Sequence, residues 1–319
     1  MVTGNKSNIT TANTIICRVA KLLASLCLIG LAGACMFLPI CHEIPGQIPV
    51  HAQLALSPDG SRLVVSWNEC SGKLHAKLLE LNGTHLASIR DLALPADTFT
   101  TEFASTNQHL LITTTNGKSS DLLKFDLDKG TAELIYKSPY VMRFPLEVSE
   151  SNYVFLEGTT AENRLSQWQR LQNGNKSLIN PRSYQMAAPL SVVGESLFLL
   201  EPWNPPAFRN LSGALPEGLN SLVIANTFSI HCADKQPLTC LRVRLYFDPT
   251  HTTMEILSGQ RHCQIPGIWK NAQGDVFSRD GNTVAFHAAQ KDVDGPRRIY
   301  VARQTATGCT TSAFSINNK

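Results

Sequence analysis

Beyond residue 50, hydrophobic residues come in short runs that Gly, Asn, Asp or Pro interrupt. Residues 62–67 (RLVVSW) and 282–287 (NTVAFH) are two such runs, and each follows a polar turn sequence. Runs of this length, bounded by turn-forming residues, are typical of β-strands. Helical periodicity nearly vanishes in the same region, so the pattern predicts an all-β domain over residues 47–319.

The strands recur as a repeat. The turns at residues 57–60 (SPDG) and 278–281 (SRDG) each lead into an apolar run, and weaker copies of that run follow at residues 108–115, 152–157 and 196–201. A hairpin beyond each run turns at Gly83, Gly130 and Gly174, which are 47 and 44 residues apart. A four-stranded β-propeller blade has a period of roughly 40–50 residues. We therefore expect a β-propeller of four-stranded blades.

The two strongest turns also carry a family resemblance. SPDG at residues 57–60 and FSRDG at residues 277–281, each followed by an apolar strand, resemble the repeat of TolB-like β-propellers. The strand Ile299-Tyr300-Val301 after Gly295-Pro296 fits the same repeat. The resemblance is one of fold, strongest in the first and last blades, and implies a propeller that is often periplasmic and often binds proteins. The residues before 47 are too few for the α/β domain of TolB itself, so we expect no TolB role.

The expected blade count is six or five. Residues 202–239 break the period with a Pro-rich loop and an apolar stretch at residues 221–232 that predicts a long strand. This region is either a degenerate fourth blade of a six-bladed ring or an insertion in a five-bladed one. At ~45 residues per blade, the length after residue 47 favours six.

The N-terminus carries a targeting signal. Residues 22–41 hold no charge, and twenty helical residues span about 30 Å, the thickness of a membrane core. Arg18 and Lys21 precede this run, and the first acid, Glu43, follows it. The positive-inside rule then predicts that residues 1–21 are cytoplasmic, residues 22–41 form a transmembrane or signal helix, and the propeller lies outside, in the periplasm.

Three fates of this helix stay open. An uncleaved, single-pass signal anchor is the preferred interpretation. Cleavage after Ala32-Gly33-Ala34 is the second, because small residues follow an apolar stretch there. The third is a lipoprotein, because the sequence LAGA before Cys35 is similar to a bacterial lipobox.

Charge excludes one class of partner. The chain has 319 residues and a net charge of +3, and residues 1–41 contain three basic residues and no acid. The remainder is neutral, which argues against nucleic-acid binding. The sequence has neither a GxSxG nucleophile elbow nor a GxGxxG dinucleotide loop, and it lacks the first Gly of a P-loop. We therefore expect no cofactor, no metal and no assignable catalytic residue.

Five of the nine cysteines lie outside the N-terminal segment. Cys232 and Cys240 bound two apolar stretches, which places them at facing ends of a hairpin, so we predict a disulfide in the oxidising periplasm. Cys263 and Cys309 form the predicted second pair, and Cys70 is left over.

One loop is the candidate binding site. Trp203, Phe208 and Arg209 combine aromatic groups, rigid neighbouring prolines and a cation, a composition that interfaces favour. They belong to the face of the ring with the longer loops. We therefore predict a membrane-tethered, non-catalytic protein-binding or scaffold module, in a bacterial envelope assembly. The alternative is an enzyme acting on a glycan, with carboxylates about 5–10 Å apart in the central funnel. The sequence identifies no small ligand.

Overall fold

The computed structural model describes residues 48–49, 51–69, 71–158, 166–179, 190–194, 196–201, 206–247, 250–290 and 297–316. The predicted cytoplasmic segment and membrane helix, residues 1–41, lie outside these ranges, as does Cys70. Among the described residues, no helix is both long enough and apolar enough to cross a membrane.

The first half of the chain forms three antiparallel four-stranded sheets, each built from consecutive strands. The first contains β1 (Gln53–Leu56), β2 (Arg62–Asn68), β3 (Leu74–Asn82) and β4 (His85–Asp91). The second contains β5 (Thr98–Phe103), β6 (His109–Thr115), β7 (Ser120–Asp126) and β8 (Thr131–Ser138). The third contains β9 (Val141–Ser149), β10 (Asn152–Gly158), β11 (Ser166–Gln172) and β12 (Asn175–Leu178).

The second half departs from this regularity. The fourth sheet, as far as the structure describes it, contains β13 (Leu190–Val193), β14 (Ser196–Glu201) and β15 (Ala207–Ser212). A 3-10 turn, η1 (Leu219–Leu222), follows. Then come β16 (Thr227–Ala233), β17 (Thr239–Phe247), β18 (Thr250–Ser258) and β19 (Arg261–Gln264). The last strands are β20 (Trp269–Phe277), β21 (Thr283–Gln290), β22 (Arg298–Gln304) and β23 (Cys309–Phe314). The final eight strands count as one sheet, because Thr252 of β18 pairs with Trp269 of β20.

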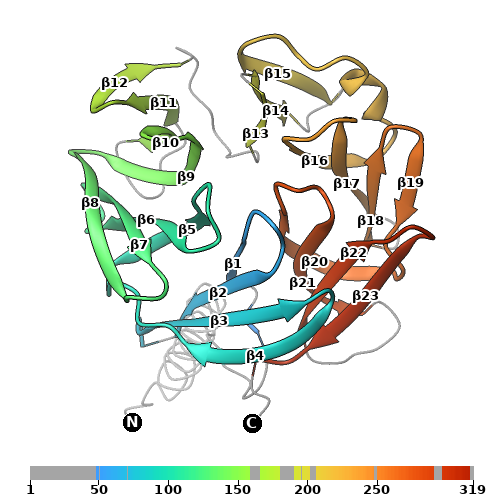
Figure 1. Cartoon of the computed structure of the whole chain (residues 1–319), viewed down its shortest axis with the longest axis horizontal. Coiled ribbons are helices and arrows are strands. Elements are labelled where there is room, and N and C mark those ends of the chain that lie inside the picture. The colour runs from blue at the N-terminus through green and yellow to red at the C-terminus, as the bar shows by residue number, and fades with distance from the viewer. Residues whose placement is uncertain are drawn as a thin grey trace, which may run out of the picture. The chain divides into compact units, whose positions relative to one another are not determined.

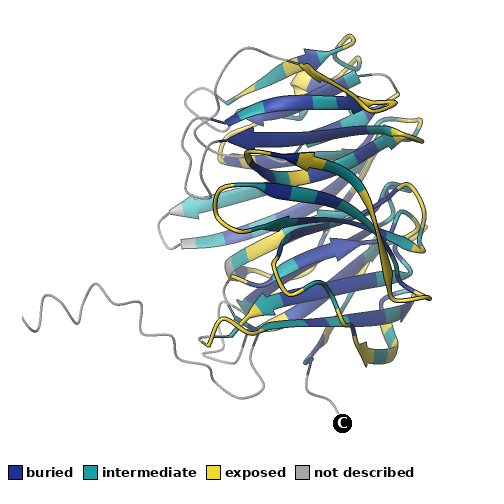
Figure 2. Ribbon diagram, turned by 90° about the vertical axis from the view of Figure 1, so that its left-hand side faces the viewer, coloured by how far each residue is buried: buried dark blue, intermediate teal, exposed yellow. Residues whose placement is uncertain are grey.

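The sheets surround a common centre, and the first strand of each lies nearest to it (Figure 1). Buried residues run along the strands, and exposed residues gather at turns and outer edges (Figure 2). The sheets therefore pack against one another through their strand faces. In β2, four consecutive residues are buried. Leu63 and Val65 pack toward the last sheet, while Val64 packs toward the second. Because β2 is covered on both faces, its sequence is a continuous apolar run and does not alternate between apolar and polar residues.

The two turns that carry the resemblance make the same hydrogen bonds. The Ser57 hydroxyl donates to Asp59 at 2.8 Å and accepts the N–H of Arg62 at 2.8 Å. Ser278 donates to Asp280 at 2.5 Å and accepts the N–H of Thr283 at 2.9 Å. Gly60 and Gly281 both take a positive φ, near 70°. The sequence repeat is thus a repeat of local hydrogen bonding.

The region 202–239 corrects one prediction. The expected strand at residues 221–232 begins only at Thr227. Gly218 has a φ of 77° and starts the 3-10 turn, and Asn226 has a φ of 65°, which interrupts an extended chain just before β16. Apolar composition alone indicated a longer strand than the 3-10 turn and the positive φ of Asn226 allow.

The ring closes by side-chain packing. Among the described strands, the first sheet and the last share no strand pairing. Leu54, Leu63 and Val65 instead pack against Ile299 and Val301 in one buried cluster. The two repeat turns also meet there, because the N–H of Asp280 donates to the carbonyl oxygen of Pro58 at 2.9 Å.

A buried histidine links the same two sheets. The side chain of His287 on β21 is fully buried, and its Nε2–H donates to the carbonyl oxygen of Ala52 at 3.0 Å. Its Nδ1 then accepts from Arg297 Nη1 at 3.0 Å. Burial, and secondly the charge of Arg297, lower the pKa of His287 to about 4. The imidazole is therefore neutral in the folded protein at pH 7.

We predict that this histidine makes stability depend on pH. Its pKa is about 4 in the folded chain and near 6.5 when unfolded, so its contribution is complete above pH ~6.5 and is lost as the pH falls toward 4. The full loss is about 3 kcal/mol by linkage. Urea unfolding at a series of pH values should show a smaller loss over this range in His287→Gln than in the wild type. Equal losses in both proteins would contradict the assignment.

Candidate functional site

The inner strands enclose a central cavity of about 590 Å³. This volume lies in the range of small-ligand and peptide-side-chain pockets. Residues of β1, β5, β9, β13, β16 and β20 line it. The cavity is therefore assembled from single short stretches that lie far apart in the sequence.

The two ends of the cavity differ. Each inner strand begins on one face of the ring, where the chain arrives from the previous sheet; we call this the connector face. Each inner strand ends on the opposite face, the turn face, where it turns into the second strand of its sheet. By the same alternation, β14 ends and β15 begins at the connector face.

An arginine crosses the cavity at the turn face. Arg279, just after β20, donates from Nη2 to the carbonyl oxygen of Glu147 on β9 at 2.5 Å. The Glu147 carboxylate accepts the N–H and hydroxyl of Ser105, each at 2.7 Å, and lies 3.2 Å from Lys124 Nζ. Burial opposes ionisation of Glu147, but these hydrogen bonds and the lysine charge outweigh it and hold its pKa below the usual value. This contact links opposite parts of the ring.

A second set of charged residues of the cavity is a histidine on β16 and an aspartate on β20. His231 Nε2 lies 2.7 Å from Asp275 Oδ2, and the hydroxyl of Ser229 donates to the same oxygen at 3.3 Å. Burial opposes ionisation of Asp275, but His231 and Ser229 outweigh it and lower its pKa. The serine donates to the aspartate and not to the histidine, so these residues do not form the serine–base pair of a nucleophilic hydrolase.

Glu102 on β5 is the unusual acid of the cavity. Burial raises its pKa to about 7, and the charges of Arg279 and His231 offset only part of this shift. A substantial fraction of this carboxyl is therefore protonated at neutral pH. Asp234 also lines the cavity, but its Oδ1 accepts the N–H of Gly194 at 2.8 Å.

Two of the phenylalanines that line the cavity are about half exposed. Phe144 on β9 and Phe228 on β16 both line it, and they are 48% and 49% exposed. Phe144 has a φ of 49°, which is rare for an aromatic residue. It lies at a bulge, because the register of β9 with β10 shifts between Val154 and Leu156. A bulge re-aims a side chain. The sequence feature that could have indicated this bulge is Pro145, because a proline inside a strand is confined to edges and bulges.

The predicted binding loop is only partly described. Trp203 lies outside the described residues. Phe208 belongs to β15 and packs edge-to-face on Phe198, with ring centroids 5.8 Å apart, beside the cluster between the fourth and fifth groups of strands. Arg209 pairs with Glu201 across β14 and β15 at 2.6 Å. Phe208 and Arg209 thus have structural contacts, and a binding role for all three residues stays a prediction.

The structure brings both expected cysteine pairs to disulfide-bonding distance. Cys232 and Cys240 lie directly opposite each other on β16 and β17, with Cα atoms 4.0 Å apart. Cys263 and Cys309 connect β19 to β23 with Cα atoms 5.6 Å apart. Within the described ranges, no group of three His, Cys, Asp or Glu residues could hold a metal ion.

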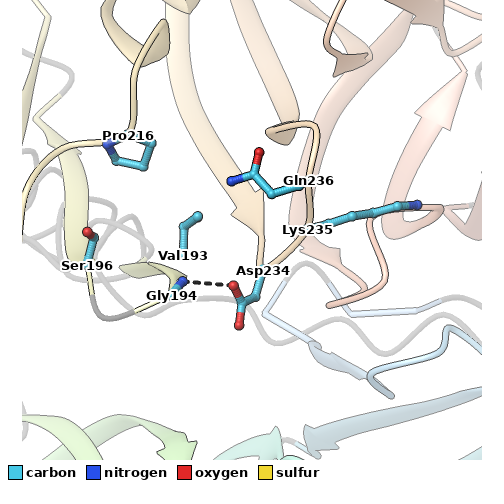
Figure 3. A pocket seen from close by; sticks show the side chains of 7 residues that line it. All are labelled: Val193, Gly194, Ser196, Pro216, Asp234, Lys235 and Gln236. Carbon is cyan, nitrogen blue, oxygen red and sulfur yellow. Dashed lines mark hydrogen bonds between the residues drawn. The ribbon is translucent and has the colours of Figure 1, made fainter.

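A second pocket, of about 400 Å³, lies at the turn after β13 and the loop after β16 (Figure 3). Its central contact is the hydrogen bond from Gly194 to Asp234. Lys235 extends away from it and donates to Asn282 at 3.1 Å. The polar groups here fix the turns to one another, so the central cavity is the stronger candidate.

Comparison with known proteins identifies the fold. No family model and no curated protein matches the sequence. Among solved structures, TolB from Acinetobacter baumannii is similar with a TM-score of 0.55 at 10% identity, over 82% of this chain and 63% of that one. The chain has the fold of a TolB-like β-propeller. This confirms the resemblance drawn from the two repeat turns.

Peptidases contain similar propellers. A prolyl endopeptidase matches with a TM-score of 0.50 at 10% identity, over 82% of this chain and 42% of that one. The β-propeller domain of the Trilobed protease from Pyrococcus furiosus matches at 12% identity, with a TM-score of 0.49 over 84% of both chains. This chain therefore spans less than two thirds of the TolB and endopeptidase chains, and the likeness extends to fold alone.

We predict that Phe208 supports the fold. Phe208→Ala should lower the free energy of unfolding by about 1–3 kcal/mol, because it removes an edge-to-face pair and opens a void beside Phe198. Phe144→Ala is the matched control and should change stability by less than about 0.5 kcal/mol, because its ring is half exposed. Chemical denaturation measures both values. An unchanged stability of Phe208→Ala would restore it as a free contact residue.

Proposed function

We propose that this chain is a membrane-tethered, extracytoplasmic β-propeller that binds a protein partner at the connector face of its central cavity. We further propose that the ring has six blades. The described strands form six groups of consecutive strands, with a buried cluster between each neighbouring pair, which supports this number. The fourth blade is then the degenerate one.

The conformation of Phe144 carries the proposal. A left-handed, half-exposed aromatic residue at a bulge costs free energy twice, through backbone strain and through exposed apolar area. The protein itself leaves 48% of the Phe144 surface exposed. A partner that covers the ring of Phe144 would recover the second cost, and such strained residues concentrate at binding sites.

Exposed hydrophobic residues around the cavity also favour partner binding at the connector face. Three further exposed hydrophobic residues, Tyr140, Ile224 and Ile268, lie one to three residues before β9, β16 and β20. They therefore lie where inner strands begin, which is the connector face. Exposed apolar side chains that gather on one face are typical of protein interaction sites.

The proposed membrane tether and extracytoplasmic location of the propeller rest on the N-terminal sequence and on the cysteines. The uncharged run of residues 22–41, after Arg18 and Lys21, favours a membrane tether with the propeller outside the cytoplasm. Two cysteine pairs at bonding distance suit an oxidising compartment. The proposed setting is an assembly of the bacterial envelope.

Affinity capture from detergent-solubilised native membranes tests the proposal. We expect the wild-type chain to retain a partner and the Phe144→Ala, Phe228→Ala double variant to retain at least about tenfold less, because two central aromatic contacts are lost. Leu134→Ala, on outer strand β8, removes an exposed hydrophobic residue outside the cavity and should behave as the wild type. Equal capture by all three proteins would refute binding at this cavity.

One observation favours a second candidate, an enzyme that acts on a glycan in the same cavity. Glu102 has a pKa of about 7 while Asp275 is held ionised, and acid–base catalysis requires carboxyl groups with separated pKa values. If this candidate is correct, incubation with isolated envelope glycan yields products by mass spectrometry, and Glu102→Gln forms them at least about a hundredfold more slowly. Absence of products with the wild type would eliminate it.

A further inference from the structure

Among the described residues that line the cavity, Arg143 is one of two arginines. It lies on β9 beside Phe144 and lines the cavity, and its guanidinium carbon lies 5.2 Å from the ring centroid of Phe99 on β5. Within the described residues it forms no ion pair, and its Nη2 is buried without a hydrogen-bond partner. A buried donor left unpaired destabilises the protein unless a ligand supplies the acceptor.

The other charged groups of the cavity do not compensate Arg143. Asp275 is paired with His231, and Asp234 accepts the N–H of Gly194. The charge of Glu102 acts on Arg279, at the turn face. Burial alone lowers the pKa of Arg143, with no offset from a neighbouring carboxylate. Carboxylates of the cavity therefore act on Arg279, and none acts on Arg143.

A second unpartnered group lies on the neighbouring inner strand. Thr101 on β5 lines the same cavity and is only 5% exposed, and its hydroxyl has no hydrogen-bond partner in the described part of the chain. A hydroxyl donor and a guanidinium together match an anionic oxygen ligand. The apolar rings of Phe144 and Phe228 in the same lining favour a ligand with an apolar neighbour to that anion.

We propose that Arg143 binds a carboxylate of the partner protein, with an adjoining apolar side chain of the partner against Phe144 and Phe228. This inference rests on the proposed function, because it specifies the chemistry of the segment that enters the cavity. Arg pairs with carboxylates through two parallel hydrogen bonds, a geometry that Lys does not offer. The carboxylate comes either from an acidic side chain or from the C-terminus of the partner chain.

Three synthetic peptides test the inference and separate the two sources. The probes are acetyl-Ala-Ala-Phe with a free C-terminus, acetyl-Ala-Asp-Phe-amide, and the uncharged acetyl-Ala-Ala-Phe-amide. Isothermal titration calorimetry should show that at least one charged peptide binds the wild-type chain about tenfold more tightly than the uncharged one, as expected for a charge-assisted hydrogen bond in a partly buried site. The tighter of the two charged peptides identifies the source.

Variants of Arg143 complete the test. Arg143→Gln should abolish the preference for a charged peptide, and Arg143→Lys should retain only part of it. Arg261→Gln is the matched control, because Arg261 is exposed on outer strand β19, and it should keep the full preference. Arg143→Gln removes an unpaired charge, so we expect it to fold, and the wild-type comparison of the three peptides does not depend on any variant.

Each contrary result overturns the inference. These results are equal affinity of the wild type for charged and uncharged peptides, a preference that survives Arg143→Gln, and failure of all three peptides to bind. If Phe144→Ala weakens all three peptides equally while the charge makes no difference, the carboxylate is wrong but binding at the cavity stands. Loss of membrane-partner capture in the phenylalanine double variant reports on the proposed function separately.

Discussion

The cavity depends on how the first and last sheets meet. β1–β4 and β20–β23 are each built from consecutive strands, and no described strand of one group pairs with the other. Side-chain packing of Leu54 and Leu63 against Ile299, with the hydrogen bond from Asp280 to Pro58, closes the ring. Packing is less directional than a strand ladder, so buried shape and the neutral, buried His287 must fix the junction.

Closure determines the electrostatics of the centre. Because the ring is closed, Arg279 reaches Glu147 across the cavity and burial acts on Glu102 and Asp275. Asp275, Glu147 and Arg279 then have partners within the protein, whereas Arg143 forms no ion pair among the described residues. In the proposed binding role such a group would give specificity, because an unpaired cation in a cavity disfavours ligands that bring no anion.

Local rules accounted for the parts of the fold that depend on short stretches of sequence. The turns at residues 57–60 and 278–281 need Ser, Asp and Gly in fixed order, so the sequence alone indicated them and the family resemblance that they carry. Cys232 and Cys240 were predictable because a hairpin places its ends opposite each other. The expected strand at residues 221–232 was too long, because the positive φ of Asn226 leaves no mark in hydrophobicity.

By itself, the sequence determined the strand type, the repeat turns and the Cys232–Cys240 pair, because each depends on neighbours within one turn, strand or hairpin. Only the tertiary structure decided the candidate site. Glu102, Arg143 and Asp275 are isolated in the sequence, on three different inner strands, and no motif joins them. Their partial burial and pKa shifts, and the unpaired Nη2 of Arg143, arise when closure of the ring removes these side chains from water, a long-range effect that no local pattern encodes.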